Sequence, residues 1–140
     1  MNKKRIILET SSWYVILNEN QYHLGRCIVK LKRPCGHLGE LKKSEWDNLL
    51  TIINKLEYSL RKAFGATMFN WTCLMNDAYK DENPKPKVHI HFRPRYKKEV
   101  VFEGLVFVDE EFAHHYDNKK KIEISAEIKE KIISKIKEYI

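Results

Sequence analysis

Two histidines near residue 90 are the side chains in this sequence best suited to chemistry. They lie in the segment Lys-Val-His-Ile-His-Phe-Arg-Pro-Arg, residues 87–95, which alternates as a β-strand does. Successive side chains of a strand point to opposite faces, so one face carries Lys87, His89, His91 and Arg93. The two imidazoles would then lie about 7 Å apart, which is close enough for both to contact one phosphate group.

The charge around these histidines favours attack on phosphorus. Six lysines and arginines, and no acidic residue, occur from Lys85 to Lys98. Positive charge stabilises the oxygens of a phosphoryl transition state. It also lowers the pKa of a nearby histidine, which keeps the imidazole neutral and its lone pair free. The segment therefore indicates a site for nucleophilic attack on a phosphate ester or anhydride.

Two other interpretations of the same residues stay open. Paired histidines on a strand can be ordinary polar-face residues, and basic runs are usually solvated surface. Alternatively, the pair could ligate zinc, which needs three protein ligands in a catalytic site and four in a structural one. No carboxylate or cysteine adjoins the pair in the sequence, and only His114 and His115 could contribute from a distance. We therefore expect no metal site.

Composition limits the class of protein. The 140 residues, 43% hydrophobic and 32% charged, correspond to one globular domain. Lysine and arginine (26) outnumber aspartate and glutamate (19), and the net charge of +7 favours polyanionic partners. No apolar run approaches the about 20 residues of a membrane helix, so we expect a cytoplasmic protein without a membrane contact. Cys27, Cys35 and Cys73 fit no zinc or redox spacing and are expected to be reduced thiols.

The hydrophobic pattern predicts a single α+β domain over residues 1–140. A long helix is expected from a cap at Ser44 to Phe64, with Gly65 as its stop, and a second helix at 125–139. Strands are expected at 13–17, 23–32, 69–75, 87–92 and 100–108. This order implies a mostly antiparallel sheet of about five strands, with the long helix packed on one face and the C-terminal helix as an extension.

The strand at residues 87–95 resembles the signature of the histidine triad (HIT) family of nucleotidyl hydrolases and transferases. That signature has three histidines that alternate with apolar residues, often followed by Pro-Arg. Aligning Pro94-Arg95 places His89 at the central, nucleophilic histidine, His91 at the third and Lys87 at the first. The other register, which ends the triad at Arg93, would misplace the Pro-Arg pair.

The resemblance runs from Trp13 to Tyr96. The later string Phe-Ala-His-His-Tyr at 112–116 looks like the bacterial diadenosine tetraphosphate hydrolase-like branch of the family. In the stretch from Trp13 to Tyr96, Asn76 lies thirteen residues before His89, where the family has a phosphate-contacting Asn or Gln. Asn18, eight residues before Arg26, stands where an Asn or Asp binds the ribose. His114 and His115 are candidates for a further substrate contact.

Three positions depart from the family pattern. Lys87 replaces the first histidine, Arg26 replaces an upstream histidine, and Glu-Asn-Pro at 82–84 replaces a Gly-Gln-Ser/Thr turn. The resemblance then implies that Lys87, Arg26 and Arg95 neutralise charge in the transition state.

The implied enzyme attacks the α-phosphate of a dinucleoside polyphosphate or nucleoside phosphoramidate through a nucleotidyl-histidine at His89, with His91 contacting an oxygen. It requires no cofactor, although a divalent cation can accompany a polyphosphate, and the family's homodimer is expected.

Two alternatives are a nucleotide-binding protein without catalysis and a nucleic-acid-binding protein that stacks bases on aromatic side chains. We favour the enzyme. The aromatic residues of the nucleic-acid interpretation are Trp71, Phe92 and Tyr96.

Overall fold

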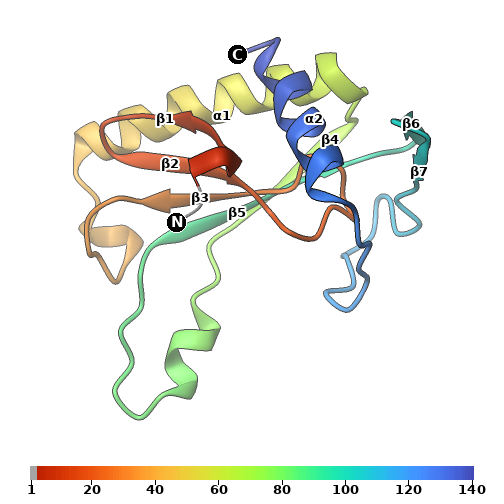
Figure 1. Cartoon of the computed structure of the whole chain (residues 1–140). Coiled ribbons are helices and arrows are strands. Elements are labelled where there is room, and N and C mark those ends of the chain that lie inside the picture. Colours follow the sequence, from red (N-terminus) through yellow and green to blue (C-terminus); the bar gives the residue numbers. More distant parts are fainter. Residues whose placement is uncertain (1–2) are drawn as a thin grey trace.

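A five-stranded antiparallel sheet organises the computed structural model, which describes residues 3–140 and leaves residues 1 and 2 of the predicted domain outside (Figure 1). The strand order in the sheet is β1-β2-β3-β5-β4, and every neighbouring pair is antiparallel. The strands are β1 Ile6–Glu9, β2 Trp13–Leu17, β3 Cys27–Leu31, β4 Met68–Thr72 and β5 His89–Arg95. The predicted α+β class is confirmed, and β1 is a strand that the sequence pattern did not indicate.

The limits of β5 differ from the prediction at both ends. The strand begins at His89, so Lys87 precedes the sheet, and it continues through Pro94. Proline lacks an N–H and is normally confined to strand edges. Here β3 pairs with β5 only as far as Phe92, and beyond that residue only β4 flanks the strand. Pro94 therefore lies where β5 has become an edge, while the carbonyl of Arg95 still accepts a hydrogen bond from Thr67 on the β4 side (2.8 Å).

The helix α1, Lys43–Phe64, covers one face of the sheet (Figure 1). It begins before the predicted cap, because the backbone N–H of Lys42 donates to the carboxylate of Glu45 (2.8 Å), which places Ser44 inside the first turn. Gly65 ends the helix as predicted, with φ of 73°. The side chains that α1 buries recur at helical spacing: Leu49, Ile52, Leu56, Leu60 and Phe64.

The second helix, α2, spans Ala126–Lys137 and packs near the C-terminal end of α1 (Figure 1). Ser125 caps it, since its hydroxyl accepts from the N–H of Ile128 (3.2 Å). On one face of the helix, Ile132, Ile133 and Ile136 are all buried in the common core. This C-terminal extension is therefore an integral part of the fold.

The segment predicted as one strand at 100–108 is instead a separate hairpin. Its strands are β6, Val100–Phe102, and β7, Leu105–Phe107. The turn residues Glu103 and Gly104 have φ of 52° and 76°, a conformation that breaks any continuous strand.

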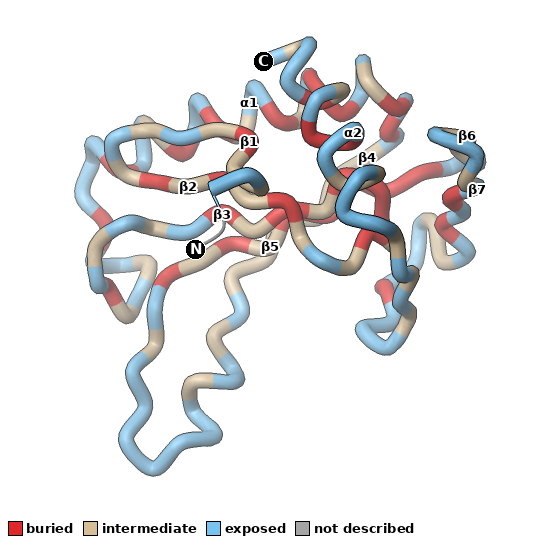
Figure 2. Tube along the Cα trace, viewed as in Figure 1, coloured by how far each residue is buried: buried red, intermediate tan, exposed pale blue. Residues whose placement is uncertain are grey.

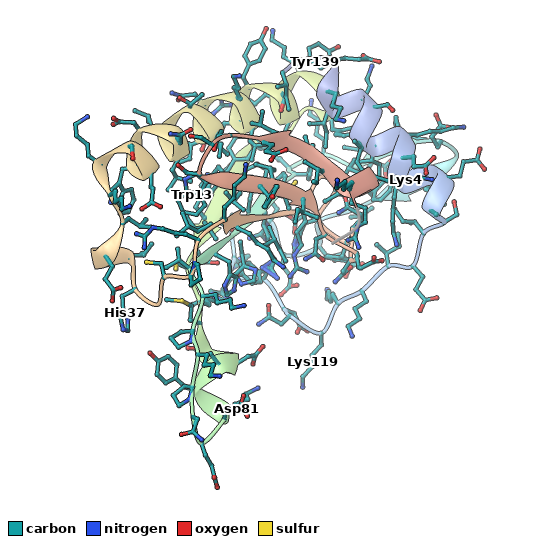
Figure 3. The ribbon with its side chains drawn as sticks, turned by 60° about the vertical axis from the view of Figure 1, so that its left-hand side comes forward. Lys4, Trp13, His37, Asp81, Lys119 and Tyr139 are labelled. Carbon is teal, nitrogen blue, oxygen red and sulfur yellow. The ribbon has the colours of Figure 1, made fainter. Side chains whose placement is uncertain are left out.

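Short 3₁₀ helices lie before β1, at Lys3–Arg5, and in two of the connections, at Leu38–Glu40 and Asn76–Lys80. The connection between β4 and β5 projects away from the sheet, with Asp81 near its tip (Figure 3), and most of its residues are exposed (Figure 2). No helix within residues 3–140 has the length and apolar character to cross a membrane. All three cysteines are free thiols, as predicted.

A segment that we call the C-terminal strap, residues 109–124, is held against the sheet by Arg95. The Arg95 side chain is 1% exposed, and it contacts the Asp109 carboxylate with two nitrogens, at 2.6 and 3.1 Å. Its remaining N–H groups donate to Asn70 (2.8 Å) and to the carbonyls of Glu111 (2.7 Å) and His114 (3.0 Å). The far end of the strap is tied to Asn20, which donates to the Lys120 carbonyl (2.9 Å).

Gly25 lets the chain approach α1 just before β3. Its φ is 85°, and a Cβ atom there would lie 2.3 Å from Cδ1 of Leu60. A side chain at this position would meet both backbone strain and a clash with the core.

Replacing Asp109 with alanine should strongly destabilise the protein, because Arg95 would remain buried with an unpaired charge. We expect a loss of about 3–5 kcal/mol in the free energy of unfolding, measured by urea denaturation. The matched control is Glu110→Ala, which removes a carboxylate from the next, exposed residue and should change stability by less than about 1 kcal/mol. Equal effects of the two substitutions would contradict a central role for the buried pair.

Candidate functional site

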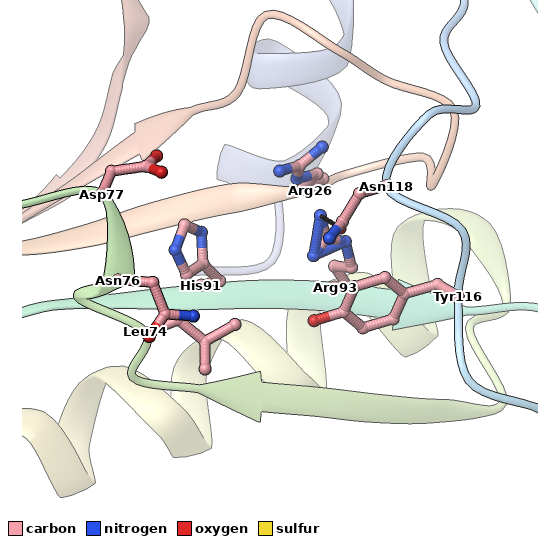
Figure 4. Close-up of a pocket in the computed structure, with 8 residues that line it drawn as sticks. All are labelled: Arg26, Leu74, Asn76, Asp77, His91, Arg93, Tyr116 and Asn118. Carbon is pink, nitrogen blue, oxygen red and sulfur yellow. Dashed lines mark hydrogen bonds between the residues drawn. The ribbon is translucent and has the colours of Figure 1, made fainter. Parts of the chain in front are cut away.

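A cavity of about 200 Å³ lies on the face of the sheet that the helices leave uncovered (Figure 4). Burial alternates along β2. On β3 and β5, the apolar residues on either side of Ile28 and His91 are buried beneath α1. Ile28 and His91 therefore point to the opposite face of the sheet, where the cavity lies. Strands, the β4–β5 connection and the C-terminal strap all contribute to its wall. The lining residues are Arg26, Leu74, Asn76, Asp77, His91, Arg93, Tyr116 and Asn118.

Strand register brings Arg26, His91 and Arg93 together. Ile28 pairs with His91 and Cys27 with Phe92, so the next residue of the β3 chain, Arg26, lies opposite Arg93. The backbone of Arg26 is fixed on both sides, because its N–H donates to the His23 carbonyl and its carbonyl accepts from the Asn18 N–H, both at 2.9 Å. The cavity floor is therefore made of regular, paired backbone.

His89 is held in one tautomer by the main chain. Its Nδ1 lies 2.8 Å from the carbonyl oxygen of Lys87, and a carbonyl can only accept a hydrogen bond. Nδ1 therefore carries the proton, and in the neutral ring the lone pair resides on Nε2. The rings of His89 and His91 meet edge to face, with centroids 4.9 Å apart. A neutral His89 thus presents a nucleophilic nitrogen beside a second imidazole.

His91 is kept neutral at physiological pH. Burial, followed by the positive potential of His89, Arg93 and Arg26, lowers its pKa to about 4, although a backbone hydrogen bond at Leu74 opposes the shift. The sequence argument expected a pKa lowered by positive charge, and burial adds the larger contribution.

The two arginines of the cavity are strongly desolvated. Burial and the charge of Arg93 lower the pKa of Arg26 to about 10, and burial lowers the pKa of Arg93 as well. Both remain cationic at neutral pH. The Arg93 guanidinium stacks on the ring of Tyr116 (3.8 Å) and donates to Asn118 (3.3 Å). Two residues of the strap therefore hold Arg93 in the wall of the cavity.

Unpaired polar atoms gather around this cavity. Native proteins pair nearly all buried polar groups, so a cluster of unpaired ones is typical of a binding site. Within residues 3–140, four buried side-chain atoms without a hydrogen-bond partner belong to this region: Arg26 Nε, Thr72 Oγ1, His91 Nδ1 and Arg93 Nε. Three are on residues that line the cavity, and Thr72 pairs with His91 across the strands.

Of the residues expected in the site, Arg26, Asn76 and His91 line the cavity, and His89 adjoins it through His91. Lys87 is exposed and contributes its carbonyl to His89. Asn18 lies at the end of β2, where its side chain accepts from the N–H of Asn20 (2.9 Å) and shapes the turn. The structure thus brings part of the expected set together.

Arg95 and the histidine pair of the strap lie elsewhere. All the hydrogen bonds of the Arg95 side chain go to protein groups, so the geometry gives it an anchoring role in place of the expected contact with substrate. His114 and His115 are exposed and line a second hollow beside β4, which shares only Tyr116 with the cavity. His115 stacks on Tyr116, with centroids 4.7 Å apart.

Arg93, Tyr116 and Asn118 were missed as site residues. The alternation of β5 placed Arg93 on the histidine face, and this signal could have identified it. Tyr116 and Asn118 arrive from the strap, which no short-range pattern places against β5.

The aromatic residues proposed to stack on nucleic-acid bases are not available for that purpose. Phe92 and Tyr96 are buried, with exposed fractions of 0% and 4%. Trp71 packs on Phe92, and its indole N–H donates to Glu57 (2.9 Å). Phe92 and Tyr96 belong to the core and Trp71 is half-buried against it, so the first two cannot stack on bases.

Solved structures supply the comparison that decides the fold, and 45 of their chains match. A histidine triad protein from Sinorhizobium meliloti 1021 superposes with a TM-score of 0.72 at 18% identity, over 96% of this chain and 88% of that chain. A hypothetical histidine triad nucleotide-binding protein from Sulfolobus tokodaii gives 0.67 at 16% identity, over 96% and 82%. The chain has the histidine triad fold.

Diadenosine triphosphate hydrolase from Plasmodium falciparum shares the histidine triad fold as well, with a TM-score of 0.66 at 19% identity over 99% of this chain and 78% of that chain. No family model and no curated protein matches the sequence. On this fold, no group of three or more His, Cys, Asp or Glu side chains within residues 3–140 is placed to hold a metal ion.

The titration of His91 tests the electrostatics of the site. Because burial and the electrostatic effects of His89, Arg93 and Arg26 lower its pKa, His91 should remain neutral down to about pH 5 in an NMR titration of the imidazole resonances. In Arg93→Gln the pKa should rise towards the ordinary value of histidine, since one of those charges is lost. Lys98→Gln removes an exposed charge and should leave the titration unchanged. A wild-type pKa above 6 would contradict the described environment.

Proposed function

We propose that the protein is a nucleotidyl hydrolase or transferase of the histidine triad type, in which His89 attacks the α-phosphate of a nucleotide substrate. The observation that carries the proposal is the hydrogen bond from His89 Nδ1 to the Lys87 carbonyl, which leaves the lone pair on Nε2. Neutral His91 and two cationic guanidinium groups lie on the same face of the sheet. This arrangement suits a nucleophile that attacks an anionic phosphorus centre.

The proposed reaction has two displacements at phosphorus. His89 Nε2 forms a bond to the α-phosphorus, and the bond to the leaving oxygen or nitrogen breaks with its electron pair on the leaving group. Water then attacks the nucleotidyl-histidine, the N–P bond breaks, and a proton is released as the nucleoside monophosphate forms. The positive charge that the ring carries in the intermediate is stabilised by the Lys87 carbonyl, which accepts from Nδ1–H throughout.

The lysine at the position of the family's first histidine is compatible with this chemistry. The contact that orients His89 uses the main chain of Lys87, and any residue at position 87 supplies the same carbonyl. We propose that the exposed Lys87 ammonium neutralises charge on the attacked phosphate and that Arg26 neutralises charge on a neighbouring phosphate group of the substrate. His91 is proposed to contact a non-bridging or leaving oxygen, and Asn76 the attacked phosphate. Asn18 is proposed to contact the ribose.

Dinucleoside polyphosphates and nucleoside phosphoramidates are the proposed substrates. The structural similarity to a diadenosine triphosphate hydrolase and the resemblance of residues 112–116 to tetraphosphate hydrolases support the first class. No cofactor is needed, and a divalent cation would enter with a polyphosphate. A cytoplasmic location is part of the proposal, and the three free thiols agree with a reducing compartment.

Substitution of His89 tests the proposal directly. His89→Ala should reduce release of AMP from diadenosine tetraphosphate and from an adenosine phosphoramidate by at least about 10³-fold, measured by product chromatography. The matched control is His37→Ala, which removes an exposed histidine outside the cavity, and it should retain wild-type rates. Full activity of His89→Ala would exclude the nucleophile. Binding of AMP without turnover in the wild type would favour a nucleotide-binding protein without catalysis.

We also propose a homodimer that joins two sheets at β4. This strand is the edge of the sheet, where backbone groups are free to pair with another chain. One side of α1 adjoins it, since Glu57 bonds to Trp71 and Arg61 lies over Phe69. Leu50, on the same side of α1 two turns earlier, is 60% exposed.

Light scattering should give a mass of twice the 16.8 kDa of the chain. Leu50→Asp should shift the population towards the monomer, because a carboxylate would be buried at the interface. Val106→Asp makes the same change on the exposed β6–β7 hairpin and should leave the mass unchanged. A wild-type monomer at micromolar concentration would contradict the proposed dimer.

A further inference from the structure

Arg93 and Arg95 are both buried on β5, but they differ in how many of their side-chain N–H groups have a hydrogen-bond partner. Arg95 is 1% exposed, and its guanidinium meets a carboxylate, an amide oxygen and two carbonyls. Arg93 is 5% exposed, yet it donates only one side-chain hydrogen bond, to Asn118, and its Nε is buried without a partner. A guanidinium offers five N–H donors, so most of those of Arg93 remain available to a ligand.

Arg26, which lies just before the neighbouring strand β3, also has unpaired side-chain N–H groups. Its Nε is also buried without a hydrogen-bond partner, and within residues 3–140 neither Arg26 nor Arg93 forms an ion pair with a carboxylate. The carboxylate of Asp77 lines the same cavity, but it pairs with Lys80 (2.8 Å). The cavity therefore contains two uncompensated positive charges.

The two charges line the same cavity, at the end of the β3–β5 pairing. Like charges this close repel: burial is the main cause of the lowered pKa of Arg26, and the charge of Arg93 lowers it further. Arg93 cannot turn freely into solvent, since it is buried and Tyr116 stacks on it at 3.8 Å, whereas Arg26 is half-buried. An anion between the two guanidinium groups would remove the repulsion and supply acceptors for the free N–H groups.

We propose that Arg26 and Arg93 bind a second phosphate group of the nucleotide, separate from the phosphate that His89 attacks. The inference rests on the proposed function and specifies its substrate class: nucleotides that carry two phosphate positions. Arg93 is four residues from His89 along β5, about 13 Å at 3.3 Å per residue. The second phosphate is therefore either a 2′- or 3′-phosphate on the ribose or a distal phosphate of the 5′ chain.

Calorimetric titrations with four ligands test this site: AMP, ADP, ATP and adenosine 3′,5′-bisphosphate. Charge-assisted hydrogen bonds contribute about 1.5–3 kcal/mol, so at least one doubly phosphorylated ligand should bind the wild type about 10- to 100-fold more tightly than AMP. Preference for the bisphosphate would identify a ribose phosphate, and preference for ADP or ATP would identify the 5′ chain. Equal affinity for all four ligands would overturn the proposal.

Variants connect the preference to the arginine pair. Arg26→Gln and Arg93→Gln should each reduce the preference to within about threefold of AMP while AMP itself still binds, and Arg93→Lys should restore only part of it because the planar fork is lost. Lys98→Gln removes an exposed charge of the same sign and should retain the preference. Retention of the preference in both glutamine variants would also overturn the proposal.

A direct readout separates this inference from the proposed function. The Nε–H NMR signals of Arg26 and Arg93 should shift when inorganic pyrophosphate is added to wild-type protein, whether or not His89 is a nucleophile. Absence of a shift with pyrophosphate and with the preferred nucleotide would reject the arginine site. Failure of the proposed function would show separately, as turnover that does not depend on His89.

Discussion

Arg95 and Asp109 bury opposite charges where β5 leaves the sheet, and both side chains are 1% exposed. A buried pair of this kind is stable only when its other hydrogen-bonding groups are also satisfied. Here Asn70, two carbonyls of the strap and the N–H of Tyr96 complete the set. The pair therefore joins β5, β4 and the C-terminal strap at one point. The position of Tyr116, and with it one wall of the cavity, depends on this anchor.

The anchor divides β5 into two functional parts. Its first half presents His89 and His91, whose rings meet edge to face, and its second half ends in the fully paired Arg95. Arg93 lies between these parts and takes its aromatic contact from the strap. A strand of seven residues thus supplies the proposed nucleophile, an electrostatic surface and a structural anchor. The same alternation buries Ile90 and Phe92 beneath α1, so the geometry of the histidine face and core packing constrain each other.

Local patterns were sufficient for most of the elements, and tertiary context decided the rest. The periodicity of α1 and the caps of both helices follow from nearby residues, apart from the cap at Lys42, which depends on Glu45. The extension of β5 through Pro94 could not be predicted, because it requires that β3 end first. The cavity shows the same division. The histidine face follows from alternation, whereas the role of Arg95 depends on Asp109, fourteen residues away.

Gly25 connects packing in the core with the position of the cavity residue Arg26. The absence of a side chain allows the backbone to lie against Leu60 of α1, and Arg26 is the next residue. The backbone that carries Arg26 into the cavity therefore packs against the core at the preceding residue. A side chain at residue 25, or a change of volume at residue 60, would disturb the Arg26 backbone without altering any residue that lines the cavity.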